Sequence, residues 1–510
     1  MRTMTNVIEL HKVNEVYIQV TTEPSIEKEI SDLFKYRLEG YQHTPAGRNG
    51  WQGWIYLFNI KKHLLFAGHL KRLLDFAKEH NYTVEYNADL FIANNFSLIE
   101  AKDFIKSLNI HSNGKSLIAR DNQELALAKA IRYKKITIIS PTRSGKSFVL
   151  YSYIRYLLDS KTCRLGLLLV PTKSLVEQMF TDFQDYSSVN QWPVQDRIQR
   201  LYGGFTSDIA PETRVLVATW QSLYKLDPEY FEQFDFLICD EAHTAKAKEI
   251  GNICTQCINA GYRLGVTGTD HDNDLSNIKI EGYFGPITKL TTTKKLMDAG
   301  HIASLNIKSI VLKHPPGTKK IVKSLIKTTA MAAKYQAEID YIVDCLARNL
   351  FLRNLVLSIE GTSLVMFNYE RHGVIIHDLI REKLDESLRK LFFINGKTET
   401  EVREQVRRIA NDAENSIIVG SSVFATGITI PNLRNIILAT PTKAKIRTLQ
   451  TIGRSLGIGD NKTTATVYDI ADDFSETKYE RSNYTFGHYL KRLKFYEDEK
   501  FDITTYEVIL

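Results

Sequence analysis

Short apolar runs that alternate with helix-like stretches restrict the fold of this sequence more than any other feature. The runs are three to six residues long, are rich in Leu, Ile and Val, and recur from about residue 115 onward. Five lie at residues 136–139, 165–170, 215–219, 236–239 and 264–267, and five more at 364–367, 391–394, 417–419, 435–439 and 466–470. Continuous apolar strands separated by helices are typical of parallel sheets that are covered on both faces. The sequence therefore predicts two similar α/β domains in tandem.

The remaining segments complete a predicted domain order. A chain of 510 residues is too long for one hydrophobic core. Residues 1–110 read as a small α/β module, and the first parallel-sheet domain is expected at 111–310. A lysine-rich linker is expected at 311–335, followed at 336–510 by the second domain with a C-terminal helical tail. The predicted fold class is α/β, with two tandem parallel-sheet domains behind a small α/β N-terminal domain.

Cysteine content and apolar run length indicate where the protein works. The longest wholly apolar stretches are far shorter than the roughly 20 residues that span a bilayer. Five cysteines, an odd number, favour reduced thiols and a cytoplasmic location, which is the host cytoplasm if a phage encodes the chain. Cys254 and Cys257 have zinc-ligand spacing, but no second ligand pair follows, so two small buried residues are the favoured interpretation.

Almost the entire positive charge lies in one segment. The chain carries 66 Lys and Arg against 59 Asp and Glu, a net charge of +7. Residues 286–330 contain nine lysines and a single acidic residue, Asp298, whereas the flanking regions are close to neutral. Such a segment is either a solvated connector or a surface that contacts phosphates. Charge alone favours neither of these two interpretations.

The eight residues that follow the first apolar run form a candidate phosphate loop. They read Ser-Pro-Thr-Arg-Ser-Gly-Lys-Ser from Ser140 to Ser147, and amphipathic helical spacing follows. Backbone N–H groups of such a loop, with Thr142, Arg143, Ser144 and Gly145, cradle phosphates at a helix N-terminus. Lys146 is expected to reach the β- and γ-phosphates of ATP, and Ser147 to bind Mg²⁺. Ser140 stands where the general pattern has Gly.

Two carboxylates end the apolar run at 236–239. The sequence there reads Asp-Glu-Ala-His from Asp240 to His243. The carboxyl end of a parallel strand is where ligands bind in such sheets. Asp240 is expected beside the phosphate loop, where it can hold Mg²⁺, while Glu241 polarises the attacking water. A helix cap is the alternative interpretation. His243 is expected to couple the nucleotide site or the domains.

Seven motifs in a fixed order carry a family resemblance. GKS (145–147), PTKSLVEQ (171–178), TWQS (219–222), DEAH (240–243), TGT (267–269), ATGITIPN (425–432) and QTIGR (450–454) together resemble the superfamily-two helicases. Residues 40–59 and the segments TTTKKLMDAGHI, LVMFNYERHG and YEDEKF are similar to the UvsW-type DNA helicases of bacteriophages. This resemblance spans nearly the whole chain. It implies two RecA-like motor domains driven by ATP and Mg²⁺.

The resemblance also implies roles for individual residues. Gln123 would read the adenine edge, Thr267 and Thr269 would couple hydrolysis to strand movement, and Gly427 would let the backbone approach the nucleotide. Gln450, Gly453 and Arg454 would reach the phosphates from the second motor domain. Nucleic-acid contacts are implied for Thr172, Lys173, Thr219, Gln221, Phe367, Asn395, Gly396, Lys397 and Thr426. For the polar positions an ordinary helix cap is the alternative.

One position departs from the family pattern. The pattern Q-x-x-G-R-x-x-R ends in the arginine finger, whereas this chain has Gly457 there. A finger contributes roughly 10³-fold or more to the rate, so slower but real ATP turnover is expected. Arg454 alone, or Arg447 nearby, are the candidates to replace it.

The implied activity is an ATP-dependent DNA helicase of recombination and repair. It would act on branched or forked DNA and on RNA–DNA hybrids, and the resemblance admits a single-stranded-DNA-binding protein as a partner. Three alternatives stay open. They are an RNA helicase, a duplex translocase of the restriction-motor kind, and a strand-annealing protein with a weak or switch-like ATPase.

Overall fold

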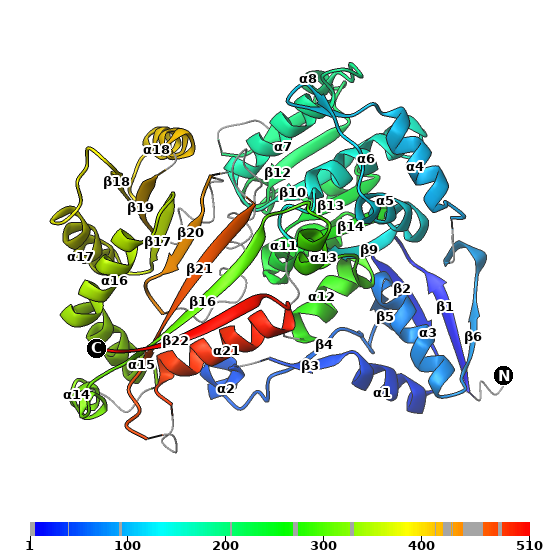
Figure 1. Cartoon of the computed structure of the whole chain (residues 1–510). Helices are drawn as coiled ribbons and strands as arrows, with labels where there is room; N and C mark the ends of the chain where they lie inside the picture. Colours follow the sequence, from blue (N-terminus) through cyan, green and yellow to red (C-terminus); the bar gives the residue numbers. More distant parts are fainter. Residues whose placement is uncertain are drawn as a thin grey trace. The chain divides into compact units, whose positions relative to one another are not determined.

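The computed structural model describes most of the chain and divides it into two compact units. The described residues are 6–38, 40–90, 94–203, 207–268, 274–326, 331–413, 415–421, 430, 432–441, 463–477 and 482–510. The units are Met1–Thr291 and Thr292–Leu510. Figure 1 shows the chain coloured from the N-terminus to the C-terminus.

The N-terminal module of the first unit is built on a small mixed sheet with the strand order β5-β2-β1-β6. Strand β1 is antiparallel to β2 and parallel to β6. Helices α1 (Pro24–Leu33) and α3 (Leu70–Glu79) contribute Ile26, Ile30 and Leu73 to its core. A separate hairpin pairs β3 (Lys35–Arg37) with β4 (Trp54–Tyr56). The sheet strands are β1 (Val7–Lys12), β2 (Tyr17–Thr21), β5 (Leu64–Phe66) and β6 (Thr83–Tyr86).

The rest of the first unit is a seven-stranded parallel sheet with the order β11-β12-β10-β13-β14-β9-β15. All five predicted strands of the first series are present. They are β9 (Lys135–Ile139), β10 (Gly166–Val170), β12 (Val215–Thr219), β13 (Phe236–Asp240) and β14 (Tyr262–Thr267). Two short edge strands, β11 (Ile198–Leu201) and β15 (Ile287–Lys289), were not predicted.

Alternate residues of these strands face two separate hydrophobic cores. Leu168 and Ile238 belong to the core that also contains residues of α5 (Asp121–Tyr133), α6 (Lys146–Asp159) and α7 (Lys173–Tyr186). Leu167 and Leu237 belong to the core with α11 (Lys248–Gln256) and α12 (Asp274–Phe284). Helices therefore cover both faces, which explains why the strands are continuously apolar.

The second unit contains another seven-stranded parallel sheet, with the order β18-β19-β17-β20-β21-β16-β22. The second predicted series is also present in full. It comprises β17 (Ser363–Phe367), β18 (Lys390–Ile394), β19 (Ser416–Ser421), β20 (Asn435–Leu438) and β21 (Thr464–Asp473). Two parallel-sheet domains and a small N-terminal domain confirm the predicted fold class.

The covering helices of this sheet also form two groups. One core includes residues of α13 (Thr293–Asp298), α18 (Thr400–Asp412) and α21 (Tyr484–Asp498). The other includes residues of α16 (Leu346–Ser358) and α17 (Glu370–Arg381). Helices α14 (Thr318–Ser324) and α15 (Met331–Asp344) contribute Val322, Ala337 and Ile342 to a smaller cluster with Phe474.

The structure corrects two predicted boundaries in the second unit. Residues 304–310 were assigned to the first domain and 311–335 to a linker, but β16 (Ser304–Lys313) pairs with β21 and β22 in the second sheet. The lysine-rich segment is therefore largely strand and helix. The expected helical tail also differs, because α21 is followed by β22 (Asp502–Ile509), an edge strand of the same sheet.

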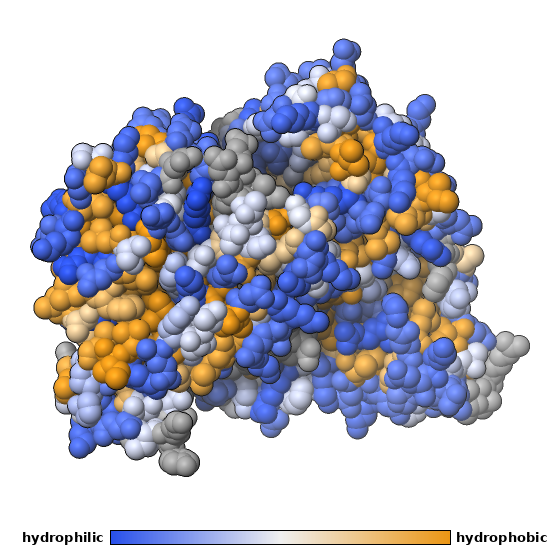
Figure 2. All heavy atoms as spheres, viewed as in Figure 1, coloured by the Kyte–Doolittle hydropathy of each residue, from blue (hydrophilic) through white to orange (hydrophobic). Residues whose placement is uncertain are grey.

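On the face shown in Figure 2, groups of hydrophobic residues alternate with hydrophilic ones. Within the described ranges, no helix has both the length and the apolar character needed to cross a membrane.

Candidate active site

The phosphate loop connects β9 to α6 and is held closed by its own hydrogen bonds. The Ser140 N–H donates to the carbonyl oxygen of Thr267 at 2.9 Å, which ties the loop to β14. The Ser140 hydroxyl donates to Oγ of Ser144 at 2.7 Å. Lys146 Nζ donates to the Ser140 carbonyl at 3.4 Å, so the lysine folds back over the loop. The ammonium group and the first N–H groups of α6 therefore face the same small space.

Gly145 and Gln123 fit together at the N-terminus of α6. Gly145 has a φ of +83°, and a Cβ atom there would lie 2.0 Å from Nε2 of Gln123. Gln123 is 5% exposed and donates from Nε2 to the Ser144 carbonyl at 3.0 Å. Its Oε1 accepts from the Arg120 N–H at 2.9 Å, and the Arg120 guanidinium donates to the Arg143 carbonyl at 3.0 Å. The predicted adenine-reading glutamine thus contacts the phosphate loop directly.

Ser147 has two neighbours that sequence reasoning missed. Its hydroxyl shares a hydrogen bond of 2.9 Å with the hydroxyl of Tyr186. Burial raises the pKa of Asp182 to about 6, although its hydrogen bond with Ser147 acts in the opposite direction. Both neighbours lie on α7, one turn apart, and no local motif marks them. The predicted metal-binding hydroxyl therefore lies beside a carboxyl group and a phenol.

The acidic pair lies at the same edge of the sheet as the phosphate loop. Asp240, the last residue of β13, is 7% exposed and is in register with Val266 of β14, which is in register with Ile138 of β9. The sequence predicted that Asp240 lies beside the phosphate loop. In the structure β14 lies between β13 and β9, so the carboxylate and the loop are separated by one strand.

Burial and neighbouring charges shift the pKa values of the two carboxyl groups in opposite directions. Burial and the neighbouring Glu241 carboxylate raise the pKa of Asp240, although Lys146 lowers it in part. Burial alone would raise the pKa of Glu241, but Lys146 and His243 hold it below its ordinary value. Nδ1 of His243 lies 3.2 Å from Oε2 of Glu241 and 3.1 Å from the Thr267 hydroxyl. Glu241 is therefore ionised at neutral pH.

These residues fit a Mg²⁺–nucleotide complex. Oε2 of Glu241 is buried beside Nδ1 of His243, 3.2 Å away. A buried carboxylate is costly unless a donor, a cation or an ordered water satisfies its oxygens. Carboxylate and hydroxyl oxygens are the ligands that Mg²⁺ prefers, and a helix N-terminus with a lysine suits phosphate. The side chains of Asp240, Glu241, Lys146 and Ser147 are therefore chemically suited to such a complex.

Comparison with known proteins gives the family. Three family models match, namely "Type III restriction enzyme, res subunit" over residues 116–272, "Helicase conserved C-terminal domain" over 347–459 and "DNA helicase UvsW, N-terminal" over 7–87. The chain is 31% identical over 513 residues to the ATP-dependent DNA helicase uvsW of Enterobacteria phage T4, covering 97% of this chain and 98% of the relative. The chain belongs to the UvsW family of DNA helicases.

Solved structures agree with this assignment. The crystal structure of T4 UvsW matches 98% of this chain and 99% of its own, with a TM-score of 0.51 and 28% identity. A fragment of a putative HsdR subunit of a type I restriction enzyme from Vibrio vulnificus YJ016 covers 80% of this chain and 70% of its own. Its TM-score is 0.55 at 16% identity, a likeness that concerns the fold alone.

The nucleic-acid residues expected in the first motor domain of this UvsW-family chain lie at strand ends. Thr172 caps α7 by accepting from the Leu175 N–H at 3.3 Å, and Nζ of the adjacent Lys173 lies 4.8 Å from the centre of the Tyr202 ring. Thr219 is a buried residue at the end of β12, whereas Gln221 is exposed. Thr172, Lys173 and Gln221 are therefore open to a ligand, while the Thr219 side chain is not.

In the second motor domain one expected contact is wrong. Phe367 is 2% exposed and stacks on Phe393 with ring centres 5.5 Å apart, so it is part of the core and cannot contact DNA from there. Asn395 forms a tight turn after β18, where Oδ1 accepts from the N–H groups of Lys397 and Thr398 at 3.0 and 3.1 Å. The Lys397 side chain is exposed on this turn.

Several other expected site residues of the family pattern lie outside the described residues. They are Thr269, Thr426, Gly427, Arg447, Gln450, Gly453, Arg454 and Gly457. Cys254 and Cys257 are described, and both are buried with carbonyl oxygens that accept from the guanidinium of Arg263.

Proposed function

We propose that this chain uses ATP hydrolysis to remodel branched DNA, including forks, junctions and RNA–DNA hybrids. Membership of the UvsW family makes it an ATP-dependent DNA helicase, and the branched substrate is our extension. One observation carries the motor assignment. The phosphate loop and a buried, ionised carboxylate lie at one edge of the sheet, and the positive charge of Lys146 acts on that carboxylate.

The chemistry follows from the charges of the described residues. Lys146 and the N-terminus of α6 bind the phosphates, and Ser147 with Asp240 would hold Mg²⁺. When bound, Mg²⁺ supplies neutralisation of the charge that develops on the transferred phosphate. Glu241, kept ionised by Lys146 and His243, orients and polarises the attacking water. Gln450 and Arg454 keep the roles that the family resemblance implies for them.

Exposed polar residues at strand ends supply a grip that does not depend on sequence. Thr172, Lys173 and Gln221 in the first motor domain, and the turn of Asn395 and Lys397 in the second, present hydroxyl, amide and ammonium groups. Such groups bind phosphates and sugars without reading bases. We propose that they hold the tracking strand, and that a single-stranded-DNA-binding protein receives the displaced strand.

The β3–β4 hairpin of the N-terminal module supports branch recognition. The guanidinium of Arg37 lies 4.5 Å from the centre of the Tyr41 ring and 5.8 Å from that of Trp54. Trp54 and Tyr56 are both exposed on the hairpin. Aromatic rings and arginine planes are the groups on which unpaired bases stack. We propose that this hairpin contacts unpaired bases next to the branch.

Lys146→Ala is the decisive variant. It should abolish both ATP hydrolysis and fork unwinding, because the phosphates lose their main countercharge. The exposed Lys161 follows the same helix, so Lys161→Ala is the matched control and should keep both activities. Steady-state ATPase is measured with single-stranded, duplex, forked and RNA–DNA cofactors. Unwinding that survives in Lys146→Ala contradicts the motor, and equal stimulation by all cofactors contradicts the branched substrate.

Gly457 favours one alternative function. A chain without the usual finger arginine could use its nucleotide site as a switch while it binds and anneals strands. Annealing that is equal with and without ATP, together with phosphate release that DNA does not stimulate, would favour that function over the motor.

A further inference from the structure

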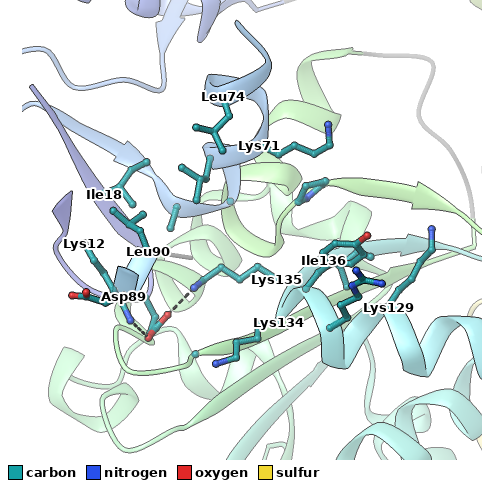
Figure 3. A pocket seen from close by; sticks show the side chains of 18 of the residues that line it. Lys12, Ile18, Lys71, Leu74, Asp89, Leu90, Lys129, Lys134, Lys135 and Ile136 are labelled. Carbon is teal, nitrogen blue, oxygen red and sulfur yellow. Dashed lines mark hydrogen bonds and ion pairs between the residues drawn. The ribbon is translucent and has the colours of Figure 1, made fainter. Parts of the chain in front are cut away.

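A pocket of about 520 Å³ lies within the first unit, where the N-terminal module meets the first motor domain. Figure 3 shows Leu74 and Lys71 of α3 on one side of it, and Lys134 and Lys129 of the motor domain on the other. Lys135 and Ile136, the first residues of β9, also line it. The phosphate loop follows the opposite end of β9, so this pocket is separate from the nucleotide site.

The wall of the pocket is apolar and ends in an exposed aromatic ring. Ile18, Leu70, Leu74, Leu90 and Ile136 contribute its hydrophobic surface. Tyr133, the last residue of α5, lines the same pocket and is 55% exposed. An exposed ring beside an apolar wall is a platform on which a planar heterocycle stacks.

The rim is strongly basic, with six cationic and two anionic side chains. They are Lys12, Lys71, Lys129, Arg132, Lys134 and Lys135 against Glu15 and Asp89. Glu15 forms ion pairs with Lys12 and Lys135, and Lys71 pairs with Asp75. No ion pair involves Lys129, Arg132 or Lys134 in the described part of the chain. Lys129 and Arg132 therefore have no anionic partner there, and the Arg132 guanidinium lies 5.9 Å from the centre of the Tyr133 ring.

Lys134 is held in place by an uncommon backbone conformation. Its φ is +58°, a region in which glycine fits without strain and a lysine does not. Its Nζ lies 5.2 Å from the centre of the Tyr262 ring, which fixes the direction of the side chain. Burial lowers the pKa of this ammonium group, and an anion bound beside it would raise that pKa again.

We propose that this pocket binds a nucleotide, with its base against Tyr133 and the apolar wall and its phosphate on Arg132 and Lys129. A bare inorganic anion would leave the apolar wall unused, and an apolar ligand would leave these cations unused. The volume lies within the range of about 300–1,000 Å³ that is usual for small-ligand sites. The nucleotide is either an unpaired residue of the DNA at a branch or a free mononucleotide. The first source rests on the branched-DNA function proposed above.

Photo-crosslinking locates the ligand. A fork with one 5-iodouracil at the unpaired position next to the junction is irradiated with the full chain, and crosslinked peptides are sequenced. We expect the peptide that contains Tyr133 among the products, and we expect Tyr133→Ala to remove that crosslink. Crosslinks confined to other peptides would exclude the DNA source.

Charge reversal tests the phosphate contact. Arg132→Glu should weaken fork binding about tenfold, and the plot of log affinity against log salt should become less steep by about 0.9 for one lost phosphate contact. The control is Lys28→Glu, an equal charge change at an exposed lysine of the N-terminal module that does not line the pocket. Equal effects of the two variants exclude the DNA source, and melting temperatures show that both remain folded.

A last comparison separates the two sources and the two proposals. Binding of dTMP is measured with a non-hydrolysable ATP analogue filling the phosphate-loop site. Binding that Arg132→Glu abolishes supports a free nucleotide, and crosslinking to the fork without dTMP binding supports the DNA source. In one outcome, the wild-type chain binds forks no better than other DNA and still crosslinks single strands at Tyr133. That result would refute the branched-DNA function and leave the pocket assignment standing. The absence of both the crosslink and dTMP binding would overturn the pocket assignment.

Discussion

We expect His69→Leu to remove a specific acid sensitivity from the first unit. His69 is fully buried beside Phe34, with ring centres 4.9 Å apart, and packs against Gly282 of the motor domain. Neither of its ring nitrogens has a hydrogen-bond partner in the described part of the chain. Burial, with a smaller contribution from Arg72, lowers its pKa from 6.5 to about 3. The folded chain therefore holds this imidazole neutral, while the unfolded chain protonates it below pH 6.5.

The size and sign of the effect follow from this pKa. Because the unfolded chain binds the extra proton, stability falls as the pH drops through 6.5 and continues to fall toward 3. At pH 5 the loss is 1.5 pH units times 1.36 kcal/mol, about 2 kcal/mol. Leucine has a similar volume and no titrating group, so it removes this loss. It sacrifices no hydrogen bond, and the variant should be at least as stable as wild type at pH 8.

Urea unfolding followed by tryptophan fluorescence measures the effect. All four tryptophans, at positions 51, 54, 192 and 220, belong to the first unit, so the signal reports that unit alone. The free-energy difference between His69→Leu and wild type should grow by about 2 kcal/mol from pH 8 to pH 5. His43→Leu, at an exposed histidine of the same module, is the control and should show no such growth. A difference that stays constant with pH would refute the reasoning.

Three further predictions concern function. Gly145→Ala should weaken binding of a fluorescent ATP analogue about tenfold, since an alanine in the left-handed conformation costs about 1–2 kcal/mol. Adding Gln123→Ala should recover part of the lost affinity, because it removes the 2.0 Å clash with Nε2 of Gln123. Affinity that does not recover would contradict the contact between Gly145 and Gln123. Gly457→Arg should raise DNA-stimulated phosphate release, by up to about 10³-fold; an unchanged rate means that this position does not limit hydrolysis. Neutralising four lysines should flatten the salt dependence of DNA binding, whereas an unchanged slope makes the segment a solvated surface. The four are Lys294, Lys295, Lys319 and Lys320.

Strands in the middle of each sheet were predictable, and strands at or near the edges were not. Central strands such as β10 and β13 are covered on both faces and contain only buried residues, so their sequences are continuously apolar. Edge strands β11 and β15 are short, and β22 is largely exposed, so none carries that signal. Strand β16 was not predicted because its lysines interrupt the apolar pattern. In the structure Lys308 lies over the Tyr468 ring and Lys313 pairs with Asp473, which allows both to lie in a strand.

The residues of the candidate active site also divide into predictable and unpredictable ones. Lys146, Ser147, Asp240 and Glu241 lie in short local motifs, and the strand ends that carry them meet because parallel strands end at one edge. The groups that touch them from elsewhere carry no such motif. Tyr186 is close to Ser147 only because α7 packs against α6. Phe367 shows the opposite error, since a motif position was given a contact that its burial prevents. Local sequence therefore indicated the reacting groups but not the packing around them.

Ser140 is the clearest case in which the structure explains a departure from a motif. The general phosphate-loop pattern has glycine at this position, which suggested an imperfect loop. Ser140 is not among the residues with positive φ, so a side chain is accommodated there without backbone strain. That side chain donates to Ser144, and the Ser140 N–H donates to Thr267, so the position joins two parts of the loop to β14. Serine therefore adds a hydrogen bond that glycine cannot make. The departure stabilises the conformation in which Lys146 and the N-terminus of α6 face the same space.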